Sequence, residues 1–495
     1  MARYKEASQD RIMVAISLAD QLIPGSFEFT LREVVDNRLD LSLFDQFYSN
    51  DQAGPKAYSP RALLKVVLFA YSKGILSSRK IEAACRTNIL FMALAGEARP
   101  DHATLASFVS AKGGVIKEVF VQVLAICAEL DLIGMEQFAL DGCKLSSNAA
   151  KEHSKTFAEY RKRLTALHAK VELLMKQHQH NDSEGERQRI HKAIRRISQR
   201  SLRIQRFLDT HSPRVHHGTR EVKSNLTDNE SAKLKTSNGY IQGYNALALS
   251  DARHQIVLNA YAIGRQYEGD ELPPFLTNSL HTAKQAGIPT SRFLAATLLA
   301  DANYFSERNC RLLLRDHKMQ ALIPDPHFRS RDARFQARST ALGIHQDDFT
   351  YDPTHDQYRC PHGKLLSFYT RVRTGSHRGR KYRSQEHDCL GCPLAQSCLT
   401  KAARRRTLFI ADAHSCLSYA EQMRQRVDSP QGKQIYARRM AIIEPVFGNI
   451  KHTKAMNRFT LRGAMKVSIQ WLCYCLVHNI EKIATTGAIK RLQMA

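Results

Sequence analysis

Apolar residues recur every three or four positions through most of the first 130 residues. The clearest runs read RALLKVVLFAYSKGI, SSRKIEAACRTNILFMALAG and DHATLASFVSAKGGVIKEVFVQVLAICAEL. This spacing predicts helices with one buried face, the second run being a short helix with a Ser cap and a Gly stop. Arg79, Lys80 and Arg86 lie between apolar faces, as in helix-turn-helix-like DNA-binding domains. The alternative for residues 1–130 is a plain helical bundle with a basic surface.

Short apolar runs bounded by turn residues predict strands further along the chain. Phe138 and Leu140 form a strand that ends at Asp141, directly before a glycine. The runs YNALALS and QIVLNAYAI predict two paired strands joined around residues 250–253. A helix is expected next, over residues 272–286.

A further apolar strand in RFLAATLLADANYFSERN ends at Asp301, and Ser306 caps the helix that follows. Asp301 therefore repeats the placement of Asp141, at the end of a buried strand. These elements predict a mixed α/β core over residues 131–325 that is completed by residues 431–495.

Heptad spacing replaces this pattern over residues 155–210. Apolar side chains alternate three and four positions apart on both sides of the turn HNDSEGE, which predicts an antiparallel helical hairpin inserted at residues 151–215. Its outer faces carry many cations, of which we single out Arg195, Arg196, Arg200 and Arg203. A charged coiled-coil face is commonly only solvated, and contact with phosphate is the second interpretation.

Residues 435–463 combine a buried stripe with charge. Glu444 lies among Ile442, Ile443, Val446, Phe447 and Ile450, and basic residues flank it on both sides. Pro445 has no N–H and fits best in a first helical turn, so a helix is expected to begin or kink at Glu444. Lys451 follows seven positions later, on nearly the same face.

Asp141, Asp301 and Glu444 together form a set of three carboxylates, which can hold divalent cations through oxygen ligands. Solvated turn residues and a solvated charged helix are the alternatives for each of them. Asp251, also close to strands, is expected to lie outside this set and to be replaceable.

Composition narrows the class of partner. The chain has 495 residues, 73 Lys and Arg against 47 Asp and Glu, and a net charge of +26. This excess indicates a long acidic polymer as partner. The beginning of the sequence lacks the apolar core of a signal peptide, and no stretch reaches the length of a membrane span. Eleven cysteines indicate a reduced cytoplasm.

Four of these cysteines form a cluster within an insertion over residues 326–430. Cys360 is followed by Cys389, Cys392 and Cys398, and the C-x-x-C spacing suits a tetrahedral structural Zn²⁺. Reduced cysteines that only cluster in the sequence are the alternative. The segment RVRTGSHRGRKYR has many cations and few apolar residues, so a mobile or DNA-facing loop is expected there.

With these motifs in place, the sequence resembles the DDE transposases of bacterial insertion sequences, specifically the 1182 type, over nearly its whole length. AYSPRALLKVVLFAYSKGILSSRKIEAACRTN is similar to the N-terminal helical domain of that family. FALDGCKLSSNA and LLADANYFS are similar to the segments with its two catalytic aspartates, and KTSNGYIQGYNALALSD to its central strands. IEPVFGNIKH, followed by NRFTLRGAMKV, is similar to the segment with the catalytic glutamate.

The resemblance implies an RNase H-like catalytic core with a helical N-terminal domain, an inserted helical hairpin and a small zinc-ribbon-like insertion. It implies that Asp141, Asp301 and Glu444 hold Mg²⁺ or Mn²⁺, two ions in all, with Asp141 bridging both. Related transposases carry Tyr, Arg, Glu and Lys at fixed intervals. Tyr436, Arg439, Glu444 and Lys451 supply these types, with one extra residue between Arg and Glu. Tyr436, Arg439 and Lys451 are accordingly expected to contact DNA.

The function implied is binding of insertion-sequence ends, followed by metal-dependent cleavage and strand transfer. Partners would be the terminal inverted repeats, target DNA and a second copy of the chain, in the bacterial cytoplasm at the nucleoid. Two alternatives remain open: a DNA-binding derivative that has lost activity, and an RNase H-like nuclease that only hydrolyses.

Overall fold

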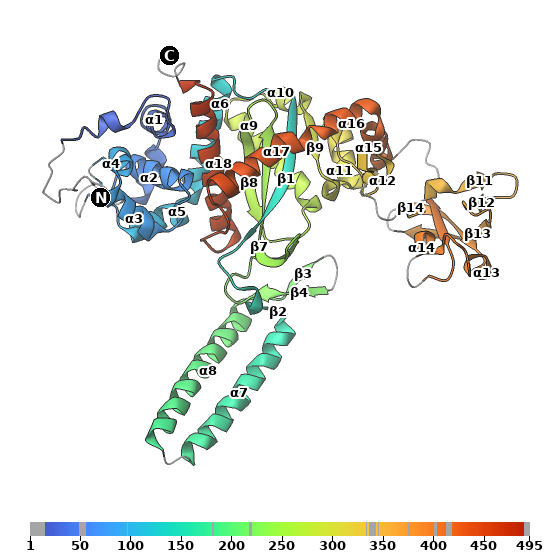
Figure 1. The fold of residues 1–495 in the computed structure, drawn as a ribbon, viewed down its shortest axis with the longest axis horizontal. Coiled ribbons are helices and arrows are strands. Elements are labelled where there is room, and N and C mark those ends of the chain that lie inside the picture. Colours follow the sequence, from blue (N-terminus) through green and yellow to red (C-terminus); the bar gives the residue numbers. More distant parts are fainter. Residues whose placement is uncertain are drawn as a thin grey trace, which may run out of the picture. The chain divides into compact units, whose positions relative to one another are not determined.

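The computed structural model describes most of the chain, and Figure 1 shows its elements. The described residues are 15–48, 56–96, 98–180, 183–216, 220–332, 334–335, 343–344, 346–374, 377–399, 403–411 and 418–489. They form two compact units, one of Met1–Ala300 with Ala437–Ala495 and one of Asp301–Tyr436. None of the described helices is long and apolar enough to cross a membrane.

The first unit begins with short helices. They are η1 (Ala19–Gln21), α1 (Phe27–Glu33), η2 (Val34–Arg38), η3 (Ser42–Phe47), α2 (Pro60–Ser72), α3 (Ser78–Thr87), α4 (Ile89–Ala95), α5 (His102–Ala111) and α6 (Gly113–Glu129). Their helical nature confirms the pattern analysis, and Asp101 caps α5 through the amides of Ala103 and Thr104. The single helix expected over SSRKIEAACRTNILFMALAG is wrong. Asn88 divides it, because its extended backbone and its side-chain cap start the new helix α4.

A mainly antiparallel sheet follows in the same unit. It contains β1 (Gln137–Ser146), β6 (Ala232–Thr236), β7 (Gly239–Asp251), β8 (Val257–Ile263) and β9 (Thr297–Ala300). Strand β7 pairs antiparallel with β1, β6 and β8, whereas β9 pairs parallel with β1. The paired strands expected at YNALALS and QIVLNAYAI are therefore confirmed.

Asp141 does not end its strand, as the sequence analysis expected. It lies within β1, opposite Ala248 of β7, and the strand continues to Ser146. The glycine that follows does not terminate pairing, because Cys143 and Leu145 continue the buried alternation along the strand.

Helices cover the sheet. Between β8 and β9 lie η5 (Gly269–Glu271), α9 (Leu272–Gln285) and α10 (Thr290–Ala295), close to the helix expected over 272–286. From the end of the chain come α17 (Arg439–Gly448), η10 (Asn449–Thr453) and α18 (Ala464–Thr485). Helix α18 is almost fully buried and packs on β8, α2 and α6, where Tyr474 stacks on Tyr71 with ring centroids 4.7 Å apart.

Helix α17 begins at Arg439 and continues through Pro445, so the expected start of a helix at Glu444 is wrong, while the alternative of a kink there stays a prediction. Proline at this position cannot donate to the carbonyl oxygen of Ala441. The Gln255 side chain approaches that oxygen instead, at 3.5 Å between Nε2 and O. The unpaired carbonyl thus has a substitute donor, and the helix tolerates its proline.

The predicted helical hairpin is confirmed as α7 (Phe157–Gln179) and α8 (Glu184–Thr210), which lie side by side in Figure 1. Thr156 and Glu159 form a capping box at the start of α7. Near the base, Phe157, Tyr160, Leu164, Ile204 and Phe207 form a separate small core. The base is completed by η4 (Lys151–His153), β2 (Ser154–Lys155), β3 (Arg214–His216), β4 (Arg220–Val222) and β5 (Ser224–Asn225).

The second unit has a helical part and a sheet. The helical part contains η6 (Ala302–Tyr304), α11 (Glu307–Arg311), η7 (Leu312–Asp316), β10 (Ala321–Leu322), α12 (Phe328–Arg331), α15 (Tyr419–Asp428) and α16 (Pro430–Ala437). Ser306 caps α11 through the amide of Asn309, as the sequence predicts. The other part contains η9 (Gln346–Asp348), α13 (Glu386–Cys389), α14 (Ala395–Cys398) and a five-stranded sheet of β11 (Thr350–Asp352), β12 (Gln357–Arg359), β13 (Leu365–Thr374), β14 (His377–Ser384) and β15 (Thr407–Ala411).

The segment RVRTGSHRGRKYR was expected to be a loop, and this expectation is wrong for the residues of the segment that the structure describes. Residues 375 and 376 lie outside the described residues. The described part of the segment forms the end of β13 and most of β14, paired in antiparallel register. A core of Phe349, Leu366, Tyr382 and Leu408 holds the sheet. Few apolar residues suffice because their neighbours along the strands face away from this core.

Candidate metal centre and nucleic-acid interface

Asp141 projects from the middle of β1 and is held on both carboxylate oxygens. Its Oδ1 accepts a hydrogen bond from its neighbour Gly142 N at 2.8 Å. Its Oδ2 accepts from Nη1 of Arg439, at the start of α17, at 2.7 Å. The two side chains are only 14 % and 10 % exposed, so this ion pair is largely shielded from water.

Asp301 follows directly on β9. The parallel register aligns Ala300 with Leu140. The next residues, Asp301 and Asp141, therefore lie at the same level of the sheet, where the pairing of β9 with β1 ends. Asp301 caps the short helix η6, with its Oδ1 accepting from Asn303 N at 2.8 Å. The structure therefore brings together the two aspartates that the sequence analysis singled out.

Glu268 is the third carboxylate at this place, and the sequence analysis did not name it. One ligand oxygen each of Asp141, Glu268 and Asp301 lies within 4.8 Å of the others. Glu268 precedes η5 and is buried, and its Oε2 accepts from Nδ2 of Asn245 at 2.6 Å. In the sequence, Glu268 lies in YEGDELPP, which resembles an ordinary acidic helix start. Carboxylates are common at such positions because they interact favourably with the helix dipole.

Glu444 lies on α17, which packs on β1 and β7. Ile442, Ile443, Val446, Phe447 and Ile450 are buried as predicted, while Glu444 itself is exposed. Its carboxylate is not part of the group within 4.8 Å. Its charge nevertheless acts on the same strand. The pKa of the Cys143 thiol is raised to about 11, mainly by burial; Lys451 lowers it, and Asp141 and Glu444 raise it. Cys143 is two residues from Asp141, so these charges surround one part of β1.

The residues predicted to contact DNA lie in different places. Tyr436 makes an edge contact with Phe328, with ring centroids 5.5 Å apart, and Lys451 is half-buried in η10. Arg439 faces Asp141. The hairpin cations are all exposed on α8, namely Arg195, Arg196, Arg200 and Arg203. Their contacts with DNA stay predictions.

Asp251 is unsuitable as the neutral control that the sequence suggested. It is completely buried, and its carboxylate accepts hydrogen bonds from the amides of Gly134, Met135 and Arg253 at 3.1, 3.0 and 2.8 Å. Burial raises its pKa, against the effect of these amides. Asp251 therefore holds the turn before β1 in place, and its substitution would disturb folding.

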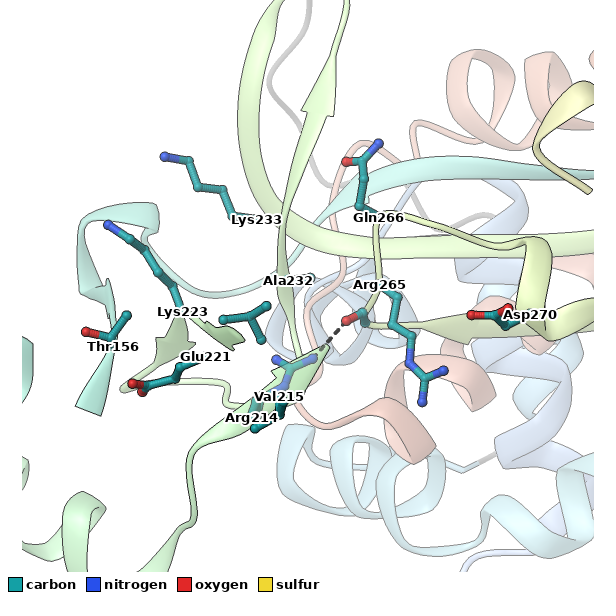
Figure 2. Close-up of a pocket in the computed structure, with 12 residues that line it drawn as sticks. Thr156, Arg214, Val215, Glu221, Lys223, Ala232, Lys233, Arg265, Gln266 and Asp270 are labelled. Atoms are coloured by element: carbon teal, nitrogen blue, oxygen red, sulfur yellow. Dashed lines mark hydrogen bonds between the residues drawn. The ribbon is translucent and has the colours of Figure 1, made fainter. Parts of the chain in front are cut away.

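A basic groove lies at the base of the hairpin (Figure 2). We define it by its lining from Thr156 before α7, from β3, β4 and β6, and from the loop after β8, with a volume of about 890 Å³. Arg214 is fixed in it by hydrogen bonds to the carbonyl oxygens of Asn229, Ser231 and Gly264 at 2.6, 2.8 and 2.9 Å. No carboxylate of the described residues forms an ion pair with this guanidinium.

Further cations line the basic groove. Lys223, Lys233 and Arg265 join Arg214, against the two carboxylates of Glu221 and Asp270. The loop after β8 contributes residues 264–266 and Asp270 to the groove, and Glu268 lies between them in the sequence. The loop that lines one end of the basic groove thus also carries Glu268, one of the three clustered carboxylates.

Cys360, Cys389, Cys392 and Cys398 lie around one small cavity of about 30 Å³ in the second unit. The Sγ of Cys360 accepts from Lys364 N at 3.2 Å, and the Sγ of Cys389 lies 3.2 Å from Ser384 Oγ. Burial raises the pKa of Cys398, and the other three cysteines raise it further. The described cysteines form no disulfide, which leaves the thiols available as ligands.

Comparison with known proteins gives two matches. The family described as "Transposase DDE domain" matches residues 359–484, which include the four cysteines, Arg439, Glu444 and Lys451. The family described as "Transposase domain (DUF772)" matches residues 17–111, which cover the N-terminal helices up to α5. Asp141, Glu268 and Asp301 lie outside both matched segments. No curated protein and no solved structure shows a significant match.

Both matches are to transposases, on separate parts of one chain, and a group of carboxylates able to bind a metal ion lies between them in the sequence. The two matched segments, residues 17–111 and 359–484, are consistent with a DDE transposase of the insertion-sequence type.

Proposed function

We propose that this transposase, of the insertion-sequence 1182 type, binds the ends of its element, cleaves the DNA there and joins the freed ends to a target. The observation that carries the proposal is the convergence of Asp141 and Asp301 from adjacent strands, with Glu444 on a helix packed against the first of them. These are the three residues that the family resemblance assigns to catalysis.

We further propose an RNase H-like catalytic core. Three features of the first unit support it: β1, β7 and β8 follow one another as an antiparallel series, a helix leads from β8 to β9, and β9 lies parallel to β1 on its other side. Catalytic side chains on adjacent strands of such a sheet are held rigidly. The inserted hairpin and the C-terminal helices leave this strand order unbroken.

Asp141, Asp301 and Glu444 are the proposed ligands of Mg²⁺ or Mn²⁺, ions that favour carboxylate oxygens. The residues fit such ions, because the carboxylates of Asp141 and Asp301 converge and a buried guanidinium, that of Arg439, balances charge at Asp141. When bound, two divalent ions activate the attacking oxygen and stabilise the leaving 3′ oxygen of an in-line displacement.

The protein's own side chains orient this reaction. Gly142 and Arg439 fix the Asp141 carboxylate from two directions. Lys451, whose charge acts on Cys143 of the same strand, is placed to contact a phosphate next to the cleaved bond. In strand transfer the freed 3′ hydroxyl replaces water as the nucleophile and attacks a target phosphate, whose own 3′ oxygen leaves.

DNA would approach along the basic surfaces. The basic groove offers four cations beside the loop of Glu268, and the exposed arginines of α8 extend the positive charge along the hairpin. In the second unit, Arg371 lies directly opposite Arg380 in the β13–β14 register. Like charges at opposed positions destabilise a sheet, and Asp356 lies 3.7 Å from the Arg380 guanidinium; a bound polyanion would add to this compensation.

We also propose that Cys360, Cys389, Cys392 and Cys398 hold a structural Zn²⁺. The four residues line one cavity, and an N–H···S bond such as that from Lys364 to Cys360 stabilises a thiolate ligand. Four thiolates at about 2.3 Å from zinc lie under 4 Å from one another. No three of these sulfurs lie within 4.8 Å of one another, so the proposal rests on their shared cavity and on the C-x-x-C spacing.

The active complex is proposed to be a homodimer. Two ends of an element must be cut and joined together, and a two-fold symmetric dimer presents two identical sites for them.

One experiment tests the central proposal. Purified full-length protein is incubated with a labelled element end, a target plasmid and Mg²⁺. Cleavage followed by joined products supports transposition. Cleavage without joining would instead identify a hydrolytic nuclease, and binding without cleavage would identify an inactive DNA-binding derivative.

A further inference from the structure

Glu268 is a buried carboxylate that no transposase motif predicts. It lies between β8 and η5, is 4 % exposed, and has one oxygen within 4.8 Å of ligand oxygens of Asp141 and Asp301. Three carboxylates this close repel one another when all are charged. The cluster alone does not establish a ligand, so the surroundings of Glu268 decide the question.

Asn245 provides an independent indication. It lies on β7, is 1 % exposed, and donates from Nδ2 to Oε2 of Glu268 at 2.6 Å. Its other polar atom, Oδ1, is buried and has no hydrogen-bond partner among the described residues. A buried amide oxygen without a partner costs free energy. Such an oxygen beside a carboxylate suits a hard cation or the water that accompanies it.

Gly142 leaves the space in which these groups meet. A Cβ at this position would lie 2.2 Å from Oε2 of Glu268, 2.5 Å from Oδ1 of Asn245 and 2.8 Å from its Nδ2. The backbone of Gly142 is in ordinary strand pairing with Leu247, so the glycine is required for space and not for a special conformation. Any other residue next to Asp141 would push Glu268 and Asn245 away from it.

We propose that Glu268 is a metal ligand of the same site as Asp141 and Asp301. Asn245 is a positioning residue, which holds Glu268 through Nδ2, while its unpaired Oδ1 lies beside Gly142. Gly142, which has no side chain, leaves the space that the side chains of Glu268 and Asn245 occupy. The inference rests on the proposed function for the identity of the cation, Mg²⁺ or Mn²⁺. Glu268 would then be a fourth carboxylate ligand besides Asp141, Asp301 and Glu444. Glu444 would approach the site from α17.

The test measures Mn²⁺ binding to the full-length protein without DNA, by electron paramagnetic resonance of free Mn²⁺. Glu268→Gln keeps an acceptor for Asn245 Nδ2 but loses the charge, so we expect at least a tenfold weaker affinity. Asn245→Leu should weaken it by about tenfold or more, since residues that orient a ligand contribute about 10–100-fold. The matched control is Glu136→Gln, an exposed carboxylate one residue before β1, which should bind Mn²⁺ as the wild type does.

The outcomes separate this inference from the proposed function. Weaker binding in both Asp141→Asn and Glu268→Gln supports it. Weaker binding in Asp141→Asn with unchanged binding in Glu268→Gln overturns the role of Glu268 and leaves the transposase site intact. Unchanged Mn²⁺ binding in both variants refutes the metal site as a whole.

A second variant tests the same proposal if Glu268→Gln folds poorly. Glu268→Asp keeps the charge on a shorter side chain, and Mn²⁺ should raise its Tm less than it raises that of the wild type, because a ligand stabilises the fold in proportion to its affinity. An equal rise in Tm for Glu268→Asp and wild type would count against Glu268 as a ligand.

Discussion

Arg439 donates a hydrogen bond to Oδ2 of Asp141 across 2.7 Å, although 298 residues separate the two in the sequence. Both side chains are nearly buried. The guanidinium therefore binds one oxygen of a proposed metal ligand and balances its charge. This pair links the start of α17 to the strand that carries the first aspartate of the proposed site.

The first prediction concerns the strength of this pair. Arg439→Ala should lower the free energy of unfolding in EDTA by about 3–5 kcal/mol, because the carboxylate of Asp141 loses its partner while buried. The double variant with Asp141→Asn should lose less than the sum of the two single variants. Urea unfolding of the four proteins measures the coupling. Additive losses would show that the contact contributes little.

The same pair predicts competition with a metal ion. Mn²⁺ should raise the Tm of Arg439→Ala more than that of the wild type, because the cation replaces the missing positive charge at Asp141. Arg439→Lys retains the charge and serves as the matched control. Equal rises in Tm for the Ala variant and the wild type would contradict the competition.

The second prediction concerns catalysis. Asp141→Asn, Asp301→Asn and Glu444→Gln should each lower cleavage of a labelled element end by at least about a thousandfold, as loss of an essential catalytic group does in other enzymes. DNA binding should persist or tighten slightly, since a negative charge near phosphate is removed.

Glu136→Gln, with its exposed side chain near the start of β1, is the control for this series and should cleave normally. Asp251→Asn is not suitable, because it removes a buried acceptor of three backbone amides. Cleavage by Glu444→Gln at the wild-type rate would show that α17 does not supply a catalytic residue.

The third prediction concerns the hairpin. Arg195, Arg196, Arg200 and Arg203 are exposed on α8. If they contact phosphate, replacing all four by Ala should reduce the slope of log affinity for DNA against log salt by up to about three to four, since each contact contributes about 0.9. Replacement by Lys keeps the charge and should preserve the slope. A slope that does not change in the Ala variant would assign the hairpin a purely structural role.

The fourth prediction concerns zinc. The purified protein should contain about one Zn²⁺ per chain, and Cys389→Ser or Cys392→Ser should lower both the metal content and the stability of the second unit. Zinc should also dissociate at acidic pH, where protons compete for thiolates, and the raised pKa of Cys398 favours the protonated form. Metal analysis of protein prepared under reducing conditions measures the content. Cys85→Ala, in α3, is the control that should keep the metal.

The fifth prediction concerns pH and His478 of α18. Its Nε2 bonds to the carbonyl oxygen of Gln255 at 2.9 Å and its Nδ1 lies 3.0 Å from Nδ2 of Asn449, so the neutral ring is fully paired. Burial lowers its pKa to about 4, whereas the unfolded chain has the ordinary value near 6.5. The unfolded state therefore binds a proton first as the pH falls, and the stability present above pH 6.5 is lost towards pH 4.

That loss should reach roughly 3 kcal/mol. The free energy of unfolding of wild type and His478→Gln, measured from pH 7 to pH 4, gives the contribution as the difference between the two curves. This difference should shrink as the pH falls. A constant difference would mean that His478 does not titrate in this range.

Local pattern was sufficient for much of the fold. The spacing of apolar residues predicted the N-terminal helices, the hairpin of α7 and α8 and the pair of β7 and β8, because each buries one face at a fixed period. It failed where a local signal competed with tertiary pairing. Pro445 lies inside α17, where Gln255 approaches the carbonyl that loses its donor, and the basic segment around Arg371 and Arg380 forms strands because its neighbours share a core.

The sequence by itself determined which aspartates to consider, Asp141 and Asp301, because a buried apolar run followed by an acid is visible locally, although Asp141 lies within β1 and not at its end. Only the tertiary structure decided that Arg439 pairs with Asp141 and that Glu268 and Asn245 meet above Gly142. Glu268 lies in a segment whose acids resemble an ordinary helix start. Its proximity to Asp141 depends on strand register and on the missing side chain of Gly142, and these are relations between distant residues that no local period encodes.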